Sequence, residues 1–142
     1  MAIQGKGSAQ WKGGLKDGKG TVSTASGVLK GTPYSFSSRF EGHQGTNPEE
    51  LIGAAHAGCF SMALSAQLDG AGLKADSIDT TATVSLEKLE AGFAITSVNL
   101  EVRAKIPGAD QAKFDELTKK AKEGCPVSKL LKANITMDAK LV

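Results

Sequence analysis

The residues from Asn47 onward constrain this fold more than any other segment, because they specify one long helix. Asn47 suits the N-cap, Pro48 suits the first helical position, and Glu50 at the third position completes a capping box. The helix is expected to run to about Leu68, and its apolar and small residues spread around nearly its whole circumference. A helix that is apolar on every side is typical of a buried central helix.

Short strands are expected before this helix, in a region rich in glycine. Glycines recur throughout residues 1–45, and this pattern favours short strands joined by tight turns. We expect an antiparallel meander with strands at residues 9–11, 20–23 and 34–41. The aromatic residues of the third strand alternate onto one face, so Arg39 is expected on the other face.

After the helix, the hydrophobic pattern predicts two long strands, two helices and a last strand. The long strands are expected at 78–86 and 93–106, and the apolar phase of the second slips near Thr96, which indicates a β-bulge. This order predicts an α+β fold in a single domain, residues 1–142. The remaining elements are an amphipathic helix with outward lysines at 110–123, a short helix at 126–132 and a strand at 135–141.

Composition argues against several functional classes. The net charge is only +2 and aromatic residues are 5% of the chain, so neither a basic surface nor base stacking favours nucleic-acid binding. Residues 1–20 lack the apolar core of a signal peptide, and we expect no apolar run long enough to span a bilayer. We therefore expect a cytoplasmic protein without membrane or nucleic-acid partners. A permanent disulfide is disfavoured in that compartment, whereas a transient catalytic disulfide is compatible with it.

The chain has two cysteines, and both settings are compatible with redox chemistry. Cys59 lies mid-helix among small and apolar residues, where burial raises the pKa of a thiol, so a reactive Cys59 requires a nearby cation. Cys125 precedes a proline that opens a helix, and at such an N-cap the helix dipole favours a thiolate. Both cysteines could instead be structural, because free cysteine is often simply buried. These patterns leave open which thiol attacks first.

Three other side chains are candidates for the same site. Glu49 opens the long helix and, unlike Glu50, has no capping role that accounts for it. Arg39 is either an exposed strand residue or a site cation. His56 lies one turn before Cys59 and is either a general base or a packing residue.

A metal site or a bound nucleotide is not expected. His43 lies in a polar, glycine-rich loop and is expected to be solvated. The histidines and cysteines lack the close ligand spacing of structural zinc sites. The chain also has neither a phosphate-binding glycine loop nor a dinucleotide fingerprint.

Helix geometry separates Glu49 from Cys59 within one chain. The two residues are ten positions apart, which is ~15 Å along a helix axis. The small residues between them would let a second copy of this helix approach closely. If the two helices cross antiparallel near Ala54, Glu49 of one chain lies beside Cys59 of the other, as a two-fold dimer allows. We therefore hypothesise a site shared across a homodimer interface.

Five motifs, spread over essentially the whole chain, carry a family resemblance. They are Gly-Thr-Val-Ser-Thr at 20–24, Arg-Phe-Glu-Gly at 39–42, Gly-Thr-Asn-Pro-Glu-Glu-Leu at 45–51, Ala-Ala-His-Ala-Gly-Cys-Phe at 54–60 and Gly-Cys-Pro-Val-Ser at 124–128. Together they resemble the osmotically inducible protein C (OsmC) and organic hydroperoxide resistance (Ohr) family of thiol-dependent peroxidases. The second and fourth motifs are similar to the OsmC branch.

The resemblance implies an intertwined homodimer, in which each half of the fold is built from both chains. It also implies that Cys59 attacks the peroxide, that Cys125 resolves the product, and that Arg39 and Glu49 serve Cys59. In this mechanism Arg39 supplies the cation and binds the peroxide oxygens, while Glu49 holds the guanidinium. The thiolate becomes a sulfenic acid, which condenses with Cys125 to a disulfide.

The resemblance also implies the small molecules that such a protein meets. Its substrates would be small organic hydroperoxides and, more weakly, hydrogen peroxide. It would need no prosthetic cofactor or metal, but an external dithiol reductant, which in this family is a lipoyl group or lipoylated protein. A pocket made by Leu51, Phe60 and Met62 is expected to favour alkyl hydroperoxides.

Two other functions remain as alternatives. The first is a thiol–disulfide exchange protein or redox sensor, which needs both cysteines but neither Arg39 nor Glu49. The second is a non-catalytic, stress-related dimer that binds apolar ligands and uses both cysteines structurally. Substitution of Arg39 separates peroxidase from exchange protein, and Cys59→Ser separates both from the ligand-binding dimer.

Overall fold

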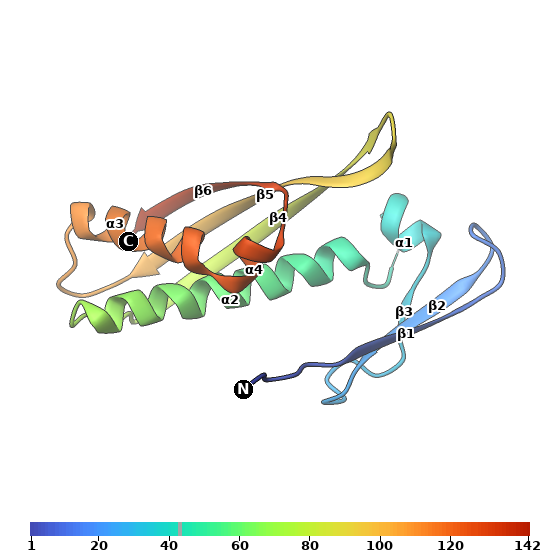
Figure 1. Cartoon of the computed structure of the whole chain (residues 1–142), viewed down its shortest axis with the longest axis horizontal. Helices are drawn as coiled ribbons and strands as arrows, with labels where there is room; N and C mark the ends of the chain where they lie inside the picture. Colours follow the sequence, from blue (N-terminus) through green and yellow to red (C-terminus); the bar gives the residue numbers. More distant parts are fainter. Residues whose placement is uncertain (43) are drawn as a thin grey trace. The chain divides into compact units, whose positions relative to one another are not determined.

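The computed structural model describes residues 1–42 and 44–142, and over these residues the chain forms two three-stranded sheets and four helices (Figure 1). The α+β class predicted from the sequence is confirmed. The chain divides into two compact units, Met1–Leu51 and Ile52–Val142, and the single-domain assignment stays a prediction. His43, which was expected in a solvated loop, lies outside the described residues.

The first sheet belongs to the first unit and is an antiparallel meander, as predicted. Its strands are ordered β1-β2-β3, and Gly20 of β2 lies opposite both Trp11 and Tyr34. The two rings contact each other with centroids 5.4 Å apart. A Cβ atom on Gly20 would lie 2.5 Å from an atom of each ring, so this aromatic pair requires glycine between its strands. The strands are β1 (Gly7–Lys12), β2 (Lys19–Thr24) and β3 (Thr32–Tyr34).

The strand expected at residues 34–41 is wrong beyond Tyr34, because a short helix, α1 (Phe36–Phe40), follows it. Ser35 and Ser38 form a reciprocal capping box. The Ser35 hydroxyl accepts from the Ser38 N–H at 3.2 Å, and the Ser38 hydroxyl accepts from the Ser35 N–H at 2.8 Å. Arg39 is therefore a helical residue in the last turn of α1 and not a strand residue.

The long helix α2 (Pro48–Gly70) begins where the sequence predicts and ends two residues later than predicted. The Glu50 N–H donates to the Asn47 side-chain oxygen at 2.7 Å, which is one half of the expected capping box. The Glu50 carboxylate accepts instead from the Thr46 hydroxyl, at 2.8 Å. The first turn of α2 is thus held by hydrogen bonds between Glu50 and the side chains of Thr46 and Asn47, the two residues before Pro48.

Within the single chain, α2 is buried along one stripe and not on every side, which corrects the expectation of a wholly buried helix. The residues of this buried stripe follow one another at intervals of about one helical turn. They are Gly53, His56, Phe60, Leu64 and Leu68. The opposite face is exposed and made of small residues and one methionine: Ala54, Ala55, Gly58, Met62 and Ala66.

Among the described residues, α2 is also the one helix long and apolar enough, by length and composition alone, to cross a membrane. The expectation that no apolar run reaches this length is therefore wrong. However, Phe60, Leu64 and Leu68 pack in the hydrophobic core of the second unit, and the core helix of a soluble protein meets the same criterion. The length of α2 is thus weak evidence for a membrane span.

The second sheet has the predicted bulge. Strands β4 (Ser77–Leu89) and β5 (Gly92–Lys105) pair antiparallel, and Ser85 lies opposite Ser97 while the next residue, Leu86, lies opposite Ile95. Thr96 is the extra residue of β5, which explains the slip in its apolar phase. The last strand, β6 (Asn134–Leu141), is parallel to β5 on its other side.

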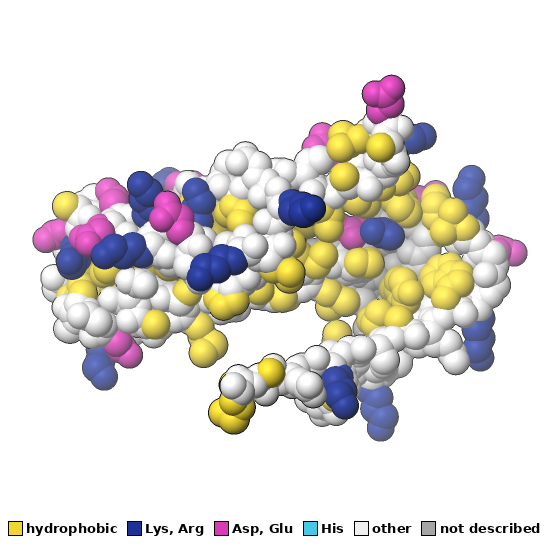
Figure 2. All heavy atoms as spheres, in the orientation of Figure 1, with side chains coloured by type: hydrophobic (Ala, Val, Ile, Leu, Met, Phe, Trp, Pro, Cys, Tyr) yellow, Lys and Arg dark blue, Asp and Glu magenta, His cyan; other side chains and the backbone are white. Residues whose placement is uncertain are grey.

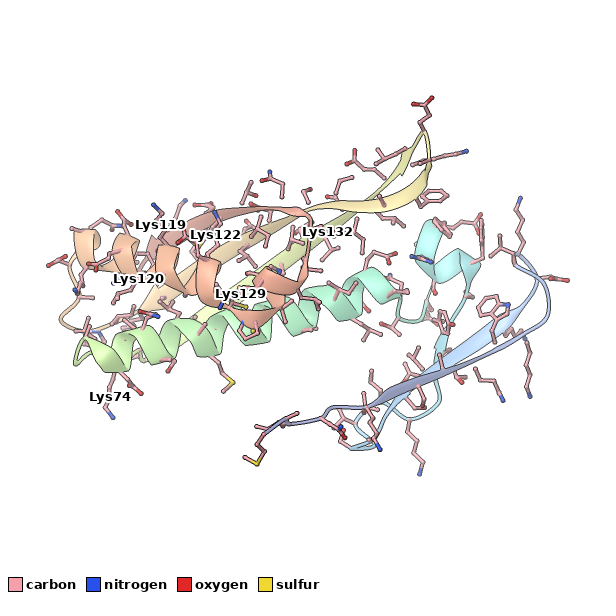
Figure 3. The ribbon with its side chains drawn as sticks, in the orientation of Figure 1. Lys74, Lys119, Lys120, Lys122, Lys129 and Lys132 are labelled. Atoms are coloured by element: carbon pink, nitrogen blue, oxygen red, sulfur yellow. The ribbon has the colours of Figure 1, made fainter. Side chains whose placement is uncertain are left out.

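Two helices connect β5 to β6. Helix α3 (Gln111–Gly124) is capped by Asp110, whose carboxylate accepts from the Lys113 N–H at 2.8 Å, and α4 (Pro126–Leu130) follows it directly. Of the α3 lysines labelled in Figure 3, Lys119 and Lys120 are exposed, as expected, and Lys122 is half-buried. Basic and acidic side chains are interspersed over α3 rather than separated by sign (Figure 2).

The hydrophobic core lies between one face of the second sheet and the helices α2 and α3. Alternate residues of β5 are buried, whereas Glu101 and Lys105 of the same strand are exposed, so the other face of the sheet is polar. All buried hydrophobic residues among those described lie in the second unit, and the first unit contributes none. They are Phe60, Leu64, Leu68, Val98, Leu100, Val102, Ala104, Ile106, Phe114, Leu117, Ala121 and Cys125.

Two glycines of α2 allow a test of how closely this helix approaches β4. A Cβ atom on Gly53 would lie 3.0 Å from the Ala82 carbonyl oxygen, whereas one on Gly58 would meet nothing within 4 Å. Helix propensity alone favours alanine at both positions by ~0.5–1 kcal/mol. We expect Gly58→Ala to raise the free energy of unfolding and Gly53→Ala to lower it, measured by urea denaturation. Equal stabilisation by both substitutions would contradict the close packing of α2 on β4.

Candidate functional site

The two cysteines, far apart in the sequence, meet in the second unit. Both are free thiols; Cys125 is fully buried and Cys59 is partly exposed. Their side chains are hydrogen-bonded to each other, and the Val127 N–H also donates to the Cys59 sulfur. Cys59 on α2 therefore lies against the N-terminal end of α4, next to Cys125.

The backbone holds Cys125 firmly at the junction of two helices. Its N–H donates to the Ala121 carbonyl at 2.9 Å and so ends α3, while its carbonyl accepts from the Lys129 N–H at 3.1 Å and so begins α4. Cys125 is the N-cap of α4, as predicted, but its thiol makes no capping hydrogen bond. The thiol is therefore available to Cys59.

The environment of Cys59 in this unit favours the neutral thiol. Burial is the main reason that the pKa of Cys59 is raised from 9.0, and the hydrogen bond between Cys59 and Cys125, which favours the protonated Cys59 thiol, raises it further. The Val127 N–H opposes both effects, because it stabilises a thiolate. A reactive thiolate at Cys59 thus needs positive charge in addition to what the second unit supplies.

His56 lies one turn before Cys59 on α2 and is completely buried. Its Nε2 atom is 2.8 Å from the hydroxyl of Ser128 on α4, and Nδ1 has no partner among the described residues. Burial lowers the pKa of His56 below 6.5, which keeps the ring neutral near pH 7. His56 is therefore a buried, hydrogen-bonded residue rather than one exposed to solvent.

Arg39 and Glu49 form a two-pronged ion pair within the first unit. Arg39 Nε donates to Glu49 Oε1 at 2.9 Å and Arg39 Nη2 donates to Glu49 Oε2 at 3.2 Å. The loop before α2 aligns the pair: the Ser38 hydroxyl donates to the Thr46 carbonyl at 2.9 Å, and the Asn47 amide donates to the Ser38 carbonyl at 3.2 Å. The Arg39 side chain is 36% exposed and Glu49 only 10%, so the guanidinium faces outward from a nearly buried carboxylate.

An aromatic cavity of about 290 Å³ adjoins Arg39 within the first unit. Two of the three residues expected to line an apolar pocket with Leu51, namely Phe60 and Met62, do not share a face of α2. Phe60 is fully buried in the core, whereas Met62 is 78% exposed on another face of α2, because residues two apart on a helix point in different directions. The cavity beside Arg39 is lined by Trp11, Leu15, Tyr34, Ser35, Phe36, Arg39 and Phe40.

The sequence did not single out several groups at these sites. Ser128 lies in the same short motif as Cys125, and its position one turn further along the predicted helix was the available signal. The Val127 N–H and the aromatic cavity have no comparable signal, because they depend on how distant segments pack. Among residues 1–42 and 44–142, no group of three or more His, Cys, Asp or Glu side chains is arranged to hold a metal ion.

Two adjacent free thiols, one buried at a helix junction and one partly exposed on a core helix, define a cysteine-based redox protein. The OsmC-like protein family model matches residues 41–140, and the chain belongs to this family.

Known relatives agree with this assignment. The chain is 61% identical over 141 residues to peroxiredoxin OsmC of Escherichia coli (strain K12), which covers 99% of each protein. It also matches the crystal structure of the organic hydroperoxide resistance protein OhrB of Bacillus subtilis, with a TM-score of 0.74 and 30% identity over 99% of this chain and 98% of that one. An OsmC-like protein from Mycoplasma pneumoniae has the same fold, with a TM-score of 0.79 at 14% identity, over 100% and 99% of the two chains.

The contact between the thiols generates a prediction about Cys59. Cys125→Ala removes the hydrogen-bond partner that raises the pKa of Cys59, so we expect this pKa to fall. The pH dependence of Cys59 alkylation by iodoacetamide, followed by mass spectrometry, measures the shift. Thr118→Ala, which removes another buried side chain of α3, is the control, and an unchanged pKa in Cys125→Ala would contradict the contact.

Proposed function

We propose that this protein is a cysteine-based peroxidase that reduces organic hydroperoxides to alcohols, with Cys59 as the attacking thiol and Cys125 as the resolving thiol. The observation that carries the proposal is the direct contact between these two free thiols, one on α2 and the other at the N-cap of α4. The names of the relatives, peroxiredoxin and organic hydroperoxide resistance protein, support the same reaction.

The reaction has two balanced steps. The Cys59 thiolate attacks one oxygen of the hydroperoxide, the O–O bond breaks, and the departing alkoxide takes a proton to become the alcohol. Cys59 is then a sulfenic acid. The Cys125 sulfur attacks the Cys59 sulfur, the S–O bond breaks, and the hydroxide leaves with the thiol proton as water. The protein ends as a Cys59–Cys125 disulfide.

Arg39 is proposed to supply the positive charge that Cys59 lacks within the second unit, with Glu49 orienting the guanidinium. The fork of Arg39 is held by two hydrogen bonds to a nearly buried carboxylate, yet the side chain is 36% exposed. An oriented, outward-facing guanidinium suits both a thiolate and the oxygens of a peroxide.

We further propose an intertwined homodimer in which Arg39 and Glu49 of one chain serve Cys59 of the other. Glu49 and Cys59 are ten positions apart on α2, or ~15 Å along its axis. Two features of the single chain support a partner: α2 exposes a face of small residues, and the first unit contributes no buried hydrophobic residue among those described. A second copy would cover both surfaces with a two-fold interface.

The proposed substrates are hydroperoxides with an apolar or aromatic substituent. The cavity beside Arg39 has several aromatic walls and about 290 Å³ of space, which suits a bulky apolar group better than hydrogen peroxide. The Arg39 guanidinium at the edge of this cavity would bind the peroxide oxygens of the substrate. Hydrogen peroxide, which has no apolar group, would be reduced more slowly.

The disulfide must be returned to two thiols by an external dithiol, for which a lipoyl group is our proposal. Cys125 is fully buried and Cys59 is partly exposed. A reductant thiolate would therefore attack Cys59 and displace Cys125, and its second thiol would release Cys59. We also propose that the protein acts in the cytoplasm, where such dithiols are kept reduced.

Stopped-flow oxidation of the reduced protein tests the peroxidase proposal. We expect rapid loss of thiol with cumene hydroperoxide, slower loss with hydrogen peroxide, and a Cys59–Cys125 disulfide as the product. Arg39→Gln should slow the reaction roughly tenfold to a hundredfold, because a hydrogen bond to a charged group is lost. Cys59→Ser is the control for background chemistry.

Two other results would replace this proposal. Oxidation by both peroxides at the rate of an ordinary free thiol would indicate that the site is not built for peroxides. If dithiol exchange were then fast and indifferent to Arg39→Gln, the protein would be a thiol–disulfide exchange protein.

Mixed dimers test the shared site. Cys59→Ser and Arg39→Gln chains are each expected to be nearly inactive, but refolding them together at equal amounts should restore about a quarter of wild-type activity. Half of the dimers would be mixed, and each would contain one intact site. If Arg39 served Cys59 of its own chain, no activity would return. Light scattering should give twice the chain mass of 14.6 kDa.

A further inference from the structure

Three consecutive contacts join the first turn of α4 to α2. The Cys125 thiol and the Val127 N–H meet Cys59, and the Ser128 hydroxyl meets His56 one turn earlier on α2. The first two contacts involve the sulfur that reacts. Of these three contacts, only the one between His56 and Ser128 leaves the reacting atoms out, so it can persist unchanged while Cys59 is oxidised.

The hydrogen-bonding pattern of His56 indicates the direction of this contact. The ring is completely buried, and Nδ1 has no partner among residues 1–42 and 44–142. A buried N–H without an acceptor is rarer and more costly than a bare nitrogen lone pair. We therefore assign the proton to Nε2, which lies 2.8 Å from the Ser128 oxygen and would donate to it. Without that oxygen the core would contain an unsatisfied N–H.

We propose that His56 and Ser128 are positioning residues for the second step of the reaction, which hold α4 against α2 so that Cys125 stays within reach of the oxidised Cys59. This inference rests on the proposed peroxidase function. The pair acts through the backbone of α4, because Ser128 and Cys125 belong to the same helical turn. Among the described residues, neither side chain is hydrogen-bonded to a sulfur atom.

The chemistry of the cycle explains why such an anchor is needed. Oxidation replaces the Cys59 thiol by a sulfenic acid, which disrupts the thiol–thiol hydrogen bond and adds an oxygen atom between the two helices. Formation of the disulfide then requires the two sulfurs to approach to ~2.05 Å while the S–O bond breaks. α4 has only five residues and little hydrogen bonding of its own, so a side-chain contact that survives oxidation limits its displacement.

Separate rates for the two steps provide the test. In Ser128→Ala we expect conversion of the Cys59 sulfenic acid to the Cys59–Cys125 disulfide to slow about tenfold, and the peroxide step to slow less. Rapid quenching and mass spectrometry distinguish thiol, sulfenic acid and disulfide. The longer-lived sulfenic acid should also be overoxidised to sulfinic acid at lower peroxide concentrations. Ser128→Thr, which keeps the hydroxyl, should restore the fast second step.

Thr118→Val is the matched control for loss of a buried hydroxyl. The Thr118 hydroxyl donates to the Phe114 and Asp115 carbonyls within α3, and no hydrogen bond among the described residues joins it to α2. We expect this variant to lose stability without slowing disulfide formation. Equal slowing in Thr118→Val and Ser128→Ala, equal slowing of both steps in Ser128→Ala, or a wild-type second step in Ser128→Ala would each overturn the positioning role.

A second measurement keeps this inference separate from the peroxidase proposal. In a glutathione redox buffer the equilibrium between dithiol and disulfide reports how well the fold holds the two cysteines together, without any peroxide. Ser128→Ala should require about tenfold more oxidising glutathione ratios than wild type to form the disulfide, and Thr118→Val should not. Slow peroxide reduction by the wild-type protein with this shift intact would refute only the peroxidase.

Discussion

The packing of one stripe of α2 against the second sheet is the interaction on which the rest of the structure depends. Phe60 and Leu64 enter the core among alternate residues of β5, and His56 lies on the same stripe. This burial fixes the rotation of α2, and the rotation places Cys59 at the edge of the stripe, partly buried and facing α4. The position of the thiol is thus a consequence of core packing and not of local sequence alone.

The buried hydrophobic residues are divided unevenly between the two units of the chain. One unit holds all of the buried hydrophobic residues described, while the other holds the Arg39–Glu49 pair and an aromatic cavity without a hydrophobic core of its own. A segment of about 50 residues that buries so little apolar surface is not expected to be stable by itself. An intertwined second copy would stabilise the first unit and complete the site in the same contact. In this arrangement stability and activity would both depend on dimer formation.

The parts of the fold set by local rules could be predicted from the sequence, and the parts set by distant packing could not. Asn47 and Asp110 mark their helix starts through side-chain caps, and the slip at Thr96 marks the bulge. In contrast, Ser35 ends a strand that alternation would continue, because a reciprocal cap to Ser38 competes with the sheet. The contact between Ser128 and His56 joins residues that only the tertiary fold brings together.

The proposed order of attack, which the sequence left open, has a physical basis in this packing. Cys125 is completely buried, and both of its backbone groups are hydrogen-bonded at the junction of two helices, so its sulfur is not exposed to a peroxide in the folded chain. Cys59 is partly exposed and receives the Val127 N–H, which favours its thiolate. However, burial and the Cys125 thiol still raise its pKa. In the proposed dimer, Arg39 would offset these effects and would also bind the peroxide oxygens, so that ionisation of Cys59 and binding of the peroxide depend on the same guanidinium. This coupling would favour reaction with bound peroxide over indiscriminate oxidation.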